Sequence, residues 1–126
     1  MAGYVEYYHS GALQKKSYDF ALRIVNAYKY LTEHQEYVIS KQLLRSGTSI
    51  GANCRESRNA QSASDFVNKL NIALKEADET AYWLELLHDS HFITEEVFLS
   101  IHNDCIEIVK LLTTIIKTTK EKMTEK

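Results

Sequence analysis

The sequence contains no proline and only four glycines among its 126 residues. Proline breaks the interior of a helix and glycine weakens it, so a chain nearly free of both is suited to long, uninterrupted helices. A β-sandwich of this length would need many turn residues, which are missing here. Apolar residues make up 44% of the chain and charged residues 25%, as in folded globular proteins rather than disordered ones. The composition therefore predicts one all-α domain around a single hydrophobic core.

The chain also lacks a strong charge imbalance, a hydrophobic leader and a membrane-length apolar run. Its formal charge is −2, whereas nucleic-acid-binding proteins are usually strongly basic. The first 16 residues contain no signal-peptide pattern, and no apolar run approaches the roughly 18 residues of a membrane span. The two cysteines, Cys54 and Cys105, lie at helical core positions, where a thiol behaves as a small hydrophobic group. We therefore expect a cytoplasmic protein that does not contact a membrane.

Apolar residues recur at helical spacing in four segments of the chain. Ser17, Ser64 and Thr94 precede three of these segments and are expected to cap their helices. The expected helices cover residues 17–36, 38–59, 64–89 and 94–120. Residues 1–16 are expected to form an irregular arm, residues 17–120 the helical domain, and residues 121–126 a polar tail. Short loops between consecutive helices predict an antiparallel, up-down-up-down four-helix bundle.

In the second, third and fourth segments, small or apolar residues recur regularly along one face of the expected helix. In the third and fourth segments the apolar positions alternate in steps of three and four, from Phe66 to Leu87 and from Phe98 to Thr119. This heptad pattern is typical of helices that pack at about 20° in bundles. In the second segment Gly47 and Gly51 lie four residues apart, and each weakens the helix by about 1 kcal/mol relative to alanine. We interpret both glycines as sites where the backbone of a neighbouring helix approaches closely; the alternative is a local weak point in the helix.

No constellation of residues supports catalysis. A di-metal carboxylate site in a bundle needs two Glu-x-x-His motifs on its helices; besides Glu85 and His88 only Glu6 and His9 form one, and that motif lies in the expected irregular arm rather than on a helix. A helical ribonuclease would need a histidine four to six residues after an arginine, and no arginine in the sequence has one. Cys105 has His102 nearby, but its place on the buried stripe suppresses thiol reactivity. We therefore expect no catalytic residue, metal site, cofactor or small-molecule substrate.

Two surfaces outside the core stripes are candidates for binding. The first is a second apolar strip on the helix of residues 64–89, which indicates a further partner and predicts assembly of several copies. This candidate oligomer interface consists of Ile72, Tyr82, Trp83 and Leu86. The second is the basic part of the chain, since residues 36–62 have a net charge of +2 while residues 63–91 have −4. Its candidate nucleic-acid face consists of Lys41, Arg45, Arg55 and Arg58.

Three blocks of the sequence are distinctive: KSYDFAL at residues 16–22, QLLRSGTSIGANCRE at 42–56 and LKEADETAYWL at 74–84. Together they resemble the bacterial four-helix bundle protein family, whose members include proteins encoded in intervening sequences of 23S rRNA genes. The resemblance extends over residues 16–118. The family that the sequence resembles is related to the accessory variability protein of diversity-generating retroelements.

The resemblance implies a four-helix protomer that assembles into a homo-oligomeric ring, commonly a pentamer. For the retroelement relative it implies nucleic-acid binding and contact with a reverse transcriptase, so an RNA- or DNA-binding accessory factor is the alternative to a binding or scaffold protein. The polar residues of the second and third blocks are candidates for a lock between helices or subunits. These residues are Arg45, Asn53, Glu56, Glu76 and Glu79.

Overall fold

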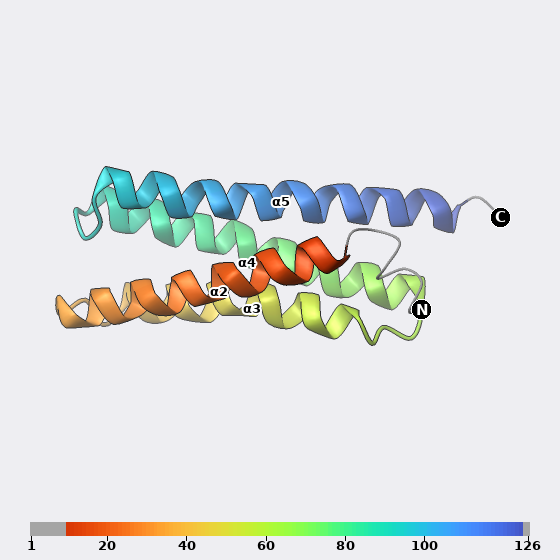
Figure 1. Ribbon diagram of the computed structural model, residues 1–126, viewed down its shortest axis with the longest axis horizontal. Helices are drawn as coiled ribbons and strands as arrows, with labels where there is room; N and C mark the ends of the chain where they lie inside the picture. Colours follow the sequence, from red (N-terminus) through yellow and green to blue (C-terminus); the bar gives the residue numbers. More distant parts are fainter. Residues whose placement is uncertain (1–9, 125–126) are drawn as a thin grey trace.

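The computed structural model describes residues 10–124, which form four helices and no strand. The helices are α2 (Ser10–Glu33), α3 (Ile39–Ser57), α4 (Ala63–Asp89) and α5 (Glu95–Met123). Each helix runs antiparallel to the next, and the start of α2 lies toward the same end of the molecule as the end of α5 (Figure 1). The predicted all-helical class with four helices is therefore confirmed. Within the described range, no helix has the length and apolar character needed to cross a membrane.

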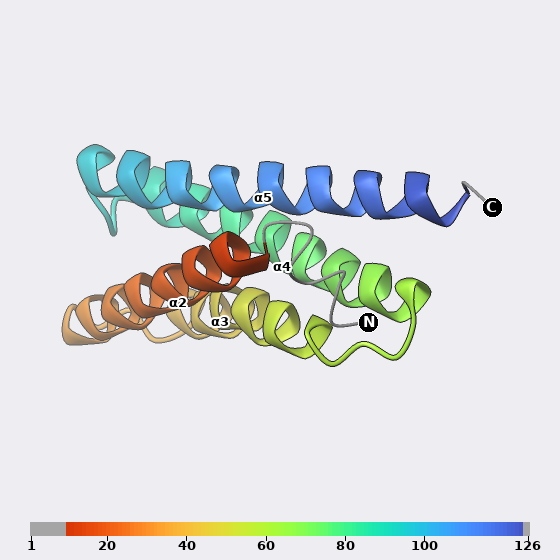
Figure 2. The ribbon, with the colours of Figure 1, turned by 45° about the vertical axis from the view of Figure 1, so that its right-hand side comes forward.

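The core is built from one apolar stripe on each helix. Phe20 and Ile24 on α2, Leu70 and Leu84 on α4, and Leu112 on α5 are all at most 2% exposed. Full burial of such a side chain stabilises the fold by roughly 1.5–3 kcal/mol. Consecutive helices make the more extensive contacts, whereas α2 and α5 touch over a smaller area. Figure 2 shows the two helical pairs, α2 with α3 and α4 with α5, side by side along the bundle.

The first helix begins earlier than the sequence pattern predicts. The expectation of an irregular arm is wrong for residues 10–16, because α2 begins at Ser10, and the remaining residues of that arm, 1–9, lie outside the described range. Leu13 extends the buried stripe of α2 and is 2% exposed. The Gln14 side-chain amide donates a hydrogen bond to the Cys54 carbonyl at 2.6 Å, which ties this turn to α3. Ser17 is therefore inside the helix, where its hydroxyl donates to the Gln14 carbonyl rather than capping a helix end.

The caps of α4 and α5 differ in how well they were predicted. The prediction that Ser64 caps α4 is wrong. Ser62 has the extended backbone of an N-cap, and its side chain accepts a hydrogen bond from the Asp65 amide at 3.0 Å. Thr94 caps α5 as expected, accepting from the Val97 amide at 3.2 Å. The helix α5 continues to Met123, so the predicted tail is helical at residues 121–123. Basic residues in this last turn suit the negative end of the helix dipole.

The start of α3 is capped by a glutamate that the sequence pattern did not predict. The Glu36 side chain is 6% exposed and accepts hydrogen bonds from the backbone amides of Val38, Ile39 and Ser40 at 3.2, 3.0 and 2.6 Å. Burial by itself raises the pKa of this carboxyl, but the three amides favour its charged form, and the net result is a lowered pKa. One side chain therefore satisfies three of the four amides that a helix start leaves without helical partners.

The two glycines of α3 lie where α2 approaches most closely. A Cβ atom at Gly51 would be 3.2 Å from the backbone carbonyl oxygen of Ser17. A Cβ atom at Gly47 would be 2.7 Å from Cγ1 of Ile24. The close backbone approach expected from the sequence is present at Gly51, whereas the expectation is wrong for Gly47, which meets the buried side chain of Ile24 instead. This contact sets the distance between α2 and α3.

Candidate functional site

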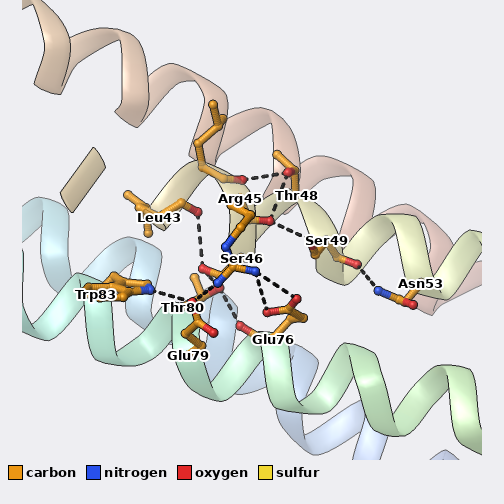
Figure 3. Close-up of polar contacts among 11 residues, drawn as sticks. Leu43, Arg45, Ser46, Thr48, Ser49, Asn53, Glu76, Glu79, Thr80 and Trp83 are labelled. Atoms are coloured by element: carbon orange, nitrogen blue, oxygen red, sulfur yellow. Dashed lines mark hydrogen bonds and ion pairs between the residues drawn. The ribbon is translucent and has the colours of Figure 1, made fainter. Parts of the chain in front are cut away.

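Arg45 on α3 reaches across to two acidic residues of α4. Its Nη1 atom lies 3.3 Å from Oε2 of Glu76, and its Nη2 atom donates to Oε2 of Glu79 (Figure 3). Glu76 and Glu79 are three residues apart, so the helix places both on the side that faces α3. The carboxylates raise the pKa of the guanidinium, chiefly through the hydrogen bond with Glu79. One cation therefore links α3 to two successive acidic positions on α4.

Trp83 completes this arrangement from one turn further along α4. Its indole Nε1 donates to Oε2 of Glu79 at 2.9 Å, so the same oxygen accepts from the tryptophan and from Arg45 (Figure 3). The pKa of Glu79 is lowered, chiefly by the hydrogen bond from Trp83 and further by Arg45. Partial burial, which is second in size, acts in the opposite direction and raises the pKa. We call Arg45, Glu76, Glu79 and Trp83 the Arg45 cluster. The arrangement fixes the orientation of the indole on the surface of α4.

A buried hydroxyl pair lies beneath the Arg45 cluster. Ser46 and Thr80 are both fully buried, and their side-chain oxygens are hydrogen-bonded across the two helices at 2.9 Å. Thr80 lies on the three-and-four spacing that runs from Phe66 to Leu87, which indicates a core position, but spacing alone assigns no partner to its hydroxyl. Because a buried polar group is tolerated only when it is hydrogen-bonded, this pair favours one register of α3 against α4.

The other two residues of the predicted polar lock do not join the Arg45 cluster. The Asn53 amide donates to the Ser49 carbonyl of its own helix at 2.9 Å. Glu56 lies 3.2 Å from the Lys69 ammonium and forms a separate link between α3 and α4. The structure therefore brings together Arg45, Glu76 and Glu79 of the predicted set, adds Trp83, and leaves Asn53 and Glu56 apart.

The four basic residues of the candidate nucleic-acid face fall into two groups. Arg45 is neutralised by its two glutamates, as described above. Lys41, Arg55 and Arg58 are exposed, and within residues 10–124 the structure gives none of them an ion pair. The available positive charge of this region therefore lies at Lys41 and Arg55 on α3 and at Arg58, its C-cap.

The candidate oligomer interface is exposed at three of its four positions. Ile72 is 37% exposed, Tyr82 57% and Leu86 36%. Trp83 is half-buried and packs against the core, with Tyr82 in an edge-on contact at a ring distance of 5.0 Å. Large apolar side chains rarely gather on a free surface without a partner. Three of these four side chains are therefore available for contact with another molecule.

The residues of the rejected catalytic patterns have structural partners. Glu85 contacts His102 at 3.3 Å, and His88 stacks on Phe98 with ring centroids 4.5 Å apart. Burial raises the pKa of the Cys105 thiol to about 12, which keeps it protonated and unreactive at neutral pH. Across the part of the chain that the structure describes, no three histidine, cysteine or acidic side chains lie close enough together to hold a metal ion.

The fold and the Arg45 cluster define a helical-bundle protein whose two middle helices are joined by polar contacts. The chain matches the 23S rRNA-intervening sequence protein family over residues 12–114, and it belongs to that family. It is similar to a solved structure of a protein of unknown function from the S23 ribosomal protein family of Bacteroides thetaiotaomicron. The two sequences are 62% identical over 85% of this chain and 96% of that chain, with a TM-score of 0.84. No curated protein matches the chain. The family resemblance inferred from the sequence blocks is thereby confirmed.

Proposed function

We propose that the protein is a non-enzymatic scaffold or binding module of the cytoplasm that assembles into a homo-oligomeric ring, a pentamer as the family resemblance implies. The observation that carries the proposal is the exposed apolar strip on α4, where Tyr82 and Leu86 lie beside the Arg45 cluster. The cluster holds this strip in one orientation because Trp83 is fixed by Glu79. An ordered apolar surface of this kind is suited to a specific protein contact.

Light scattering coupled to size exclusion tests the assembly. The expected mass for the wild-type chain is about five times 14.5 kDa, and a monomer at micromolar concentration would contradict the proposal. Tyr82→Ala combined with Leu86→Ala should lower the mass while leaving thermal unfolding nearly unchanged. Leu99→Ala on α5, which is 50% exposed, is a matched control that should keep the wild-type mass.

A second candidate function is binding of RNA or DNA, favoured by Lys41 and Arg55 on α3 and Arg58 at its C-cap, which have no ion pair among residues 10–124. Contacts with phosphates release counterions, so such binding should weaken steeply as salt is raised. Retention on heparin and fluorescence anisotropy with a labelled RNA duplex, each measured between low and physiological salt, test this function. Absence of salt-dependent binding, or binding that survives Lys41→Ala, Arg55→Ala and Arg58→Ala together, would exclude this face as the site.

A further inference from the structure

The charge of α5 is separated along its length. Residues 95–109 contain four acidic residues and no lysine or arginine. Residues 110–123 contain four lysines and one glutamate, a net charge of +3. The formal charge of −2 for the whole chain therefore conceals a locally basic surface on the second half of this helix.

Three of these lysines follow one side of the helix and point into solvent. Lys110, Thr113, Lys117 and Lys120 are all exposed, and their spacing of three, four and three residues places them in one row. We call these four residues the α5 lysine face. The helix α5 lies at an outer edge of the bundle in both views (Figures 1 and 2). It adjoins α4 and α2, whereas α3 lies diagonally opposite, so the α5 lysine face is separate from the candidate nucleic-acid face of α3.

The positive charge of the α5 lysine face is not neutralised within the protomer. The carboxylate of Glu107, one turn before Lys110, lies 4.0 Å from the ammonium of Lys16 on α2. Among residues 10–124 the structure gives no ion pair to Lys110, Lys117 or Lys120. The three ammonium groups are therefore available to a ligand of negative charge.

The segments beside this half of α5 are not acidic either. The antiparallel arrangement brings the starts of α2 and α4 to the same end of the bundle as the end of α5. Residues 10–19 of α2 and residues 63–75 of α4 each contain two basic residues and one acidic residue. A polyanion at the α5 lysine face would therefore meet no excess of carboxylates on either side.

The helix dipole accounts for only part of the lysine pattern. Cations are stabilised by the dipole within the last turn of a helix, and the effect falls off before that turn. Lys120 and Lys122 lie in the last turn of α5. Lys117 and Lys110 lie roughly two and four turns before the end at Met123, where the dipole gives them no advantage.

The composition of this surface disfavours another protein as its partner. Within the described helix, no large apolar side chain between Leu99 and Met123 is exposed. The centre of a protein–protein interface is apolar, and charged residues are depleted there. Interfaces with nucleic acid are more polar and much more positively charged, as this surface is.

We propose that the α5 lysine face binds the phosphate backbone of double-stranded nucleic acid without reading its sequence. This inference rests on the second candidate function, binding of RNA or DNA, and places that function on α5 instead of α3. Proteins that bind single strands stack the bases on aromatic side chains, and α5 has no aromatic residue after Phe98. Lysine acts on phosphates as a point charge, whereas sequence is read by groups that form directed hydrogen bonds with base edges.

The length of the face suits a phosphate backbone. Lys110 and Lys120 are separated by ten residues, which is about 15 Å along the helix axis. One strand of a duplex carries a phosphate about every 3.4 Å along its axis, so the face spans about four phosphates.

Fluorescence anisotropy of short labelled DNA and RNA duplexes, measured over a series of salt concentrations, tests the proposal. Three lysine–phosphate contacts should give a slope of about −3 in a plot of log affinity against log salt for each protomer in contact with the duplex. Lys110→Gln combined with Lys117→Gln should reduce the magnitude of this slope by about two and weaken binding at low salt by about tenfold or more. These two positions lie before the last turn, so the change leaves the interactions of Lys120 and Lys122 with the dipole in place.

Two control variants separate a specific surface from net charge. Lys15→Gln combined with Lys29→Gln on α2 removes the same charge from exposed positions outside the α5 lysine face, and it should keep the wild-type slope. Lys110→Arg combined with Lys117→Arg retains the positive charges and should also keep the slope. Circular dichroism melting should show that all three variants fold like the wild type, because the four positions are exposed.

The outcomes separate this inference from the functions proposed above. A wild-type chain that binds neither duplex in a salt-dependent way overturns both this inference and the second candidate function, while the ring proposal stands. Binding that is lost when Lys41, Arg55 and Arg58 are replaced by alanine, but is kept in the Lys110 and Lys117 glutamine variant, overturns only the assignment to α5. An equal loss in the α2 control, or tighter binding of an unpaired strand than of either duplex, also overturns the inference.

Discussion

The backbone of Gly47 lies directly against the side chain of Ile24, so closely that a Cβ atom on the glycine would be 2.7 Å from Cγ1 and 2.8 Å from Cγ2 of the isoleucine. Ile24 is fully buried, so its branched side chain has no free space into which it can move. The distance between α2 and α3 is therefore compatible only with glycine at this position. The gain in helix propensity from any larger residue is smaller than the loss from overpacking.

Gly47→Leu should consequently destabilise the protein by about 1–3 kcal/mol, as overpacked cores do. Gly11→Ala on α2 is the matched control, because no atom lies within 4 Å of the added Cβ. That variant should gain up to about 1 kcal/mol from the better helix propensity of alanine. Chemical denaturation of both variants measures the effect, and a stabilised Gly47→Leu would show that the packing explanation is wrong.

The buried hydroxyl pair of Ser46 and Thr80 predicts a non-additive result. Thr80→Val keeps the shape of the side chain but removes the cross-helix partner of the Ser46 hydroxyl, so it should destabilise the protein by about 1–3 kcal/mol. Adding Ser46→Ala removes the stranded hydroxyl and should recover part of that loss. A double-mutant cycle from urea denaturation measures this coupling. Purely additive losses would mean that the two hydroxyls do not depend on each other.

The Glu36 cap predicts a pH-dependent contribution to stability. Its pKa is lowered in the folded protein, so its contribution is present above the pKa of the unfolded chain and is lost as the pH falls through the folded pKa. Glu36→Gln should therefore reduce stability by about 1 kcal/mol at pH 7, as loss of a helix cap does. The difference from wild type should shrink below about pH 4.3, the ordinary pKa of a glutamate.

Denaturant unfolding between pH 3 and pH 7 measures this difference. Glu33→Gln, at an exposed position on the last turn of α2, is a control that should change stability little across the range. A destabilisation by Glu36→Gln that is the same at both ends of the range would show that the charge of Glu36 does not contribute.

Sequence patterns predicted the fold well because burial repeats along a helix. The heptad spacing of α4 correctly placed Thr80 in the core. The start of α2 was missed because Gly11 resembles a helix breaker, although Leu13 continues the apolar stripe and the glycine lies in open space. Glycine weakens a helix only modestly, and burial of one leucine offsets that loss.

The contacts of the candidate site were less predictable because they depend on distances between helices. The predicted polar lock grouped Arg45 with Asn53 and Glu56, yet the amide of Asn53 bonds to its own helix and Glu56 pairs with Lys69. The Trp83 indole could not be assigned to Glu79 without knowing its side-chain orientation. Spacing identifies which side of a helix a residue occupies, whereas the register between two helices decides which residues meet.

The shared oxygen of Glu79 predicts a measurable change when the tryptophan is replaced. Trp83→Phe keeps an aromatic ring against the core but removes the Nε1–H donor. Because the Trp83 hydrogen bond is the largest cause of the shift, the pKa of Glu79 should rise toward its ordinary value in this variant. Carbon-detected NMR titration of the Glu79 carboxyl group in the two proteins measures this. An unchanged pKa would mean that the indole does not bond to the carboxylate in solution.

The last prediction concerns the energetic coupling between Arg45 and Glu79. Both side chains are partly solvent-exposed, so water and salt screen their attraction, and the pair by itself should contribute only modestly. The shared contacts with Glu76 and Trp83 nevertheless hold both partners in place, which reduces the conformational entropy that a free surface pair would lose. Arg45→Ala and Glu79→Ala should each reduce stability more than Lys110→Ala, an exposed lysine on α5 without an ion pair among the described residues. The double variant should lose less than the two single losses combined, because removing either residue already breaks the shared interaction. Denaturant unfolding of the four proteins, repeated at high salt, measures the coupling and its screening. Additive losses equal to that of Lys110→Ala would show that the Arg45 cluster is a solvated surface pair and does not order the strip on α4.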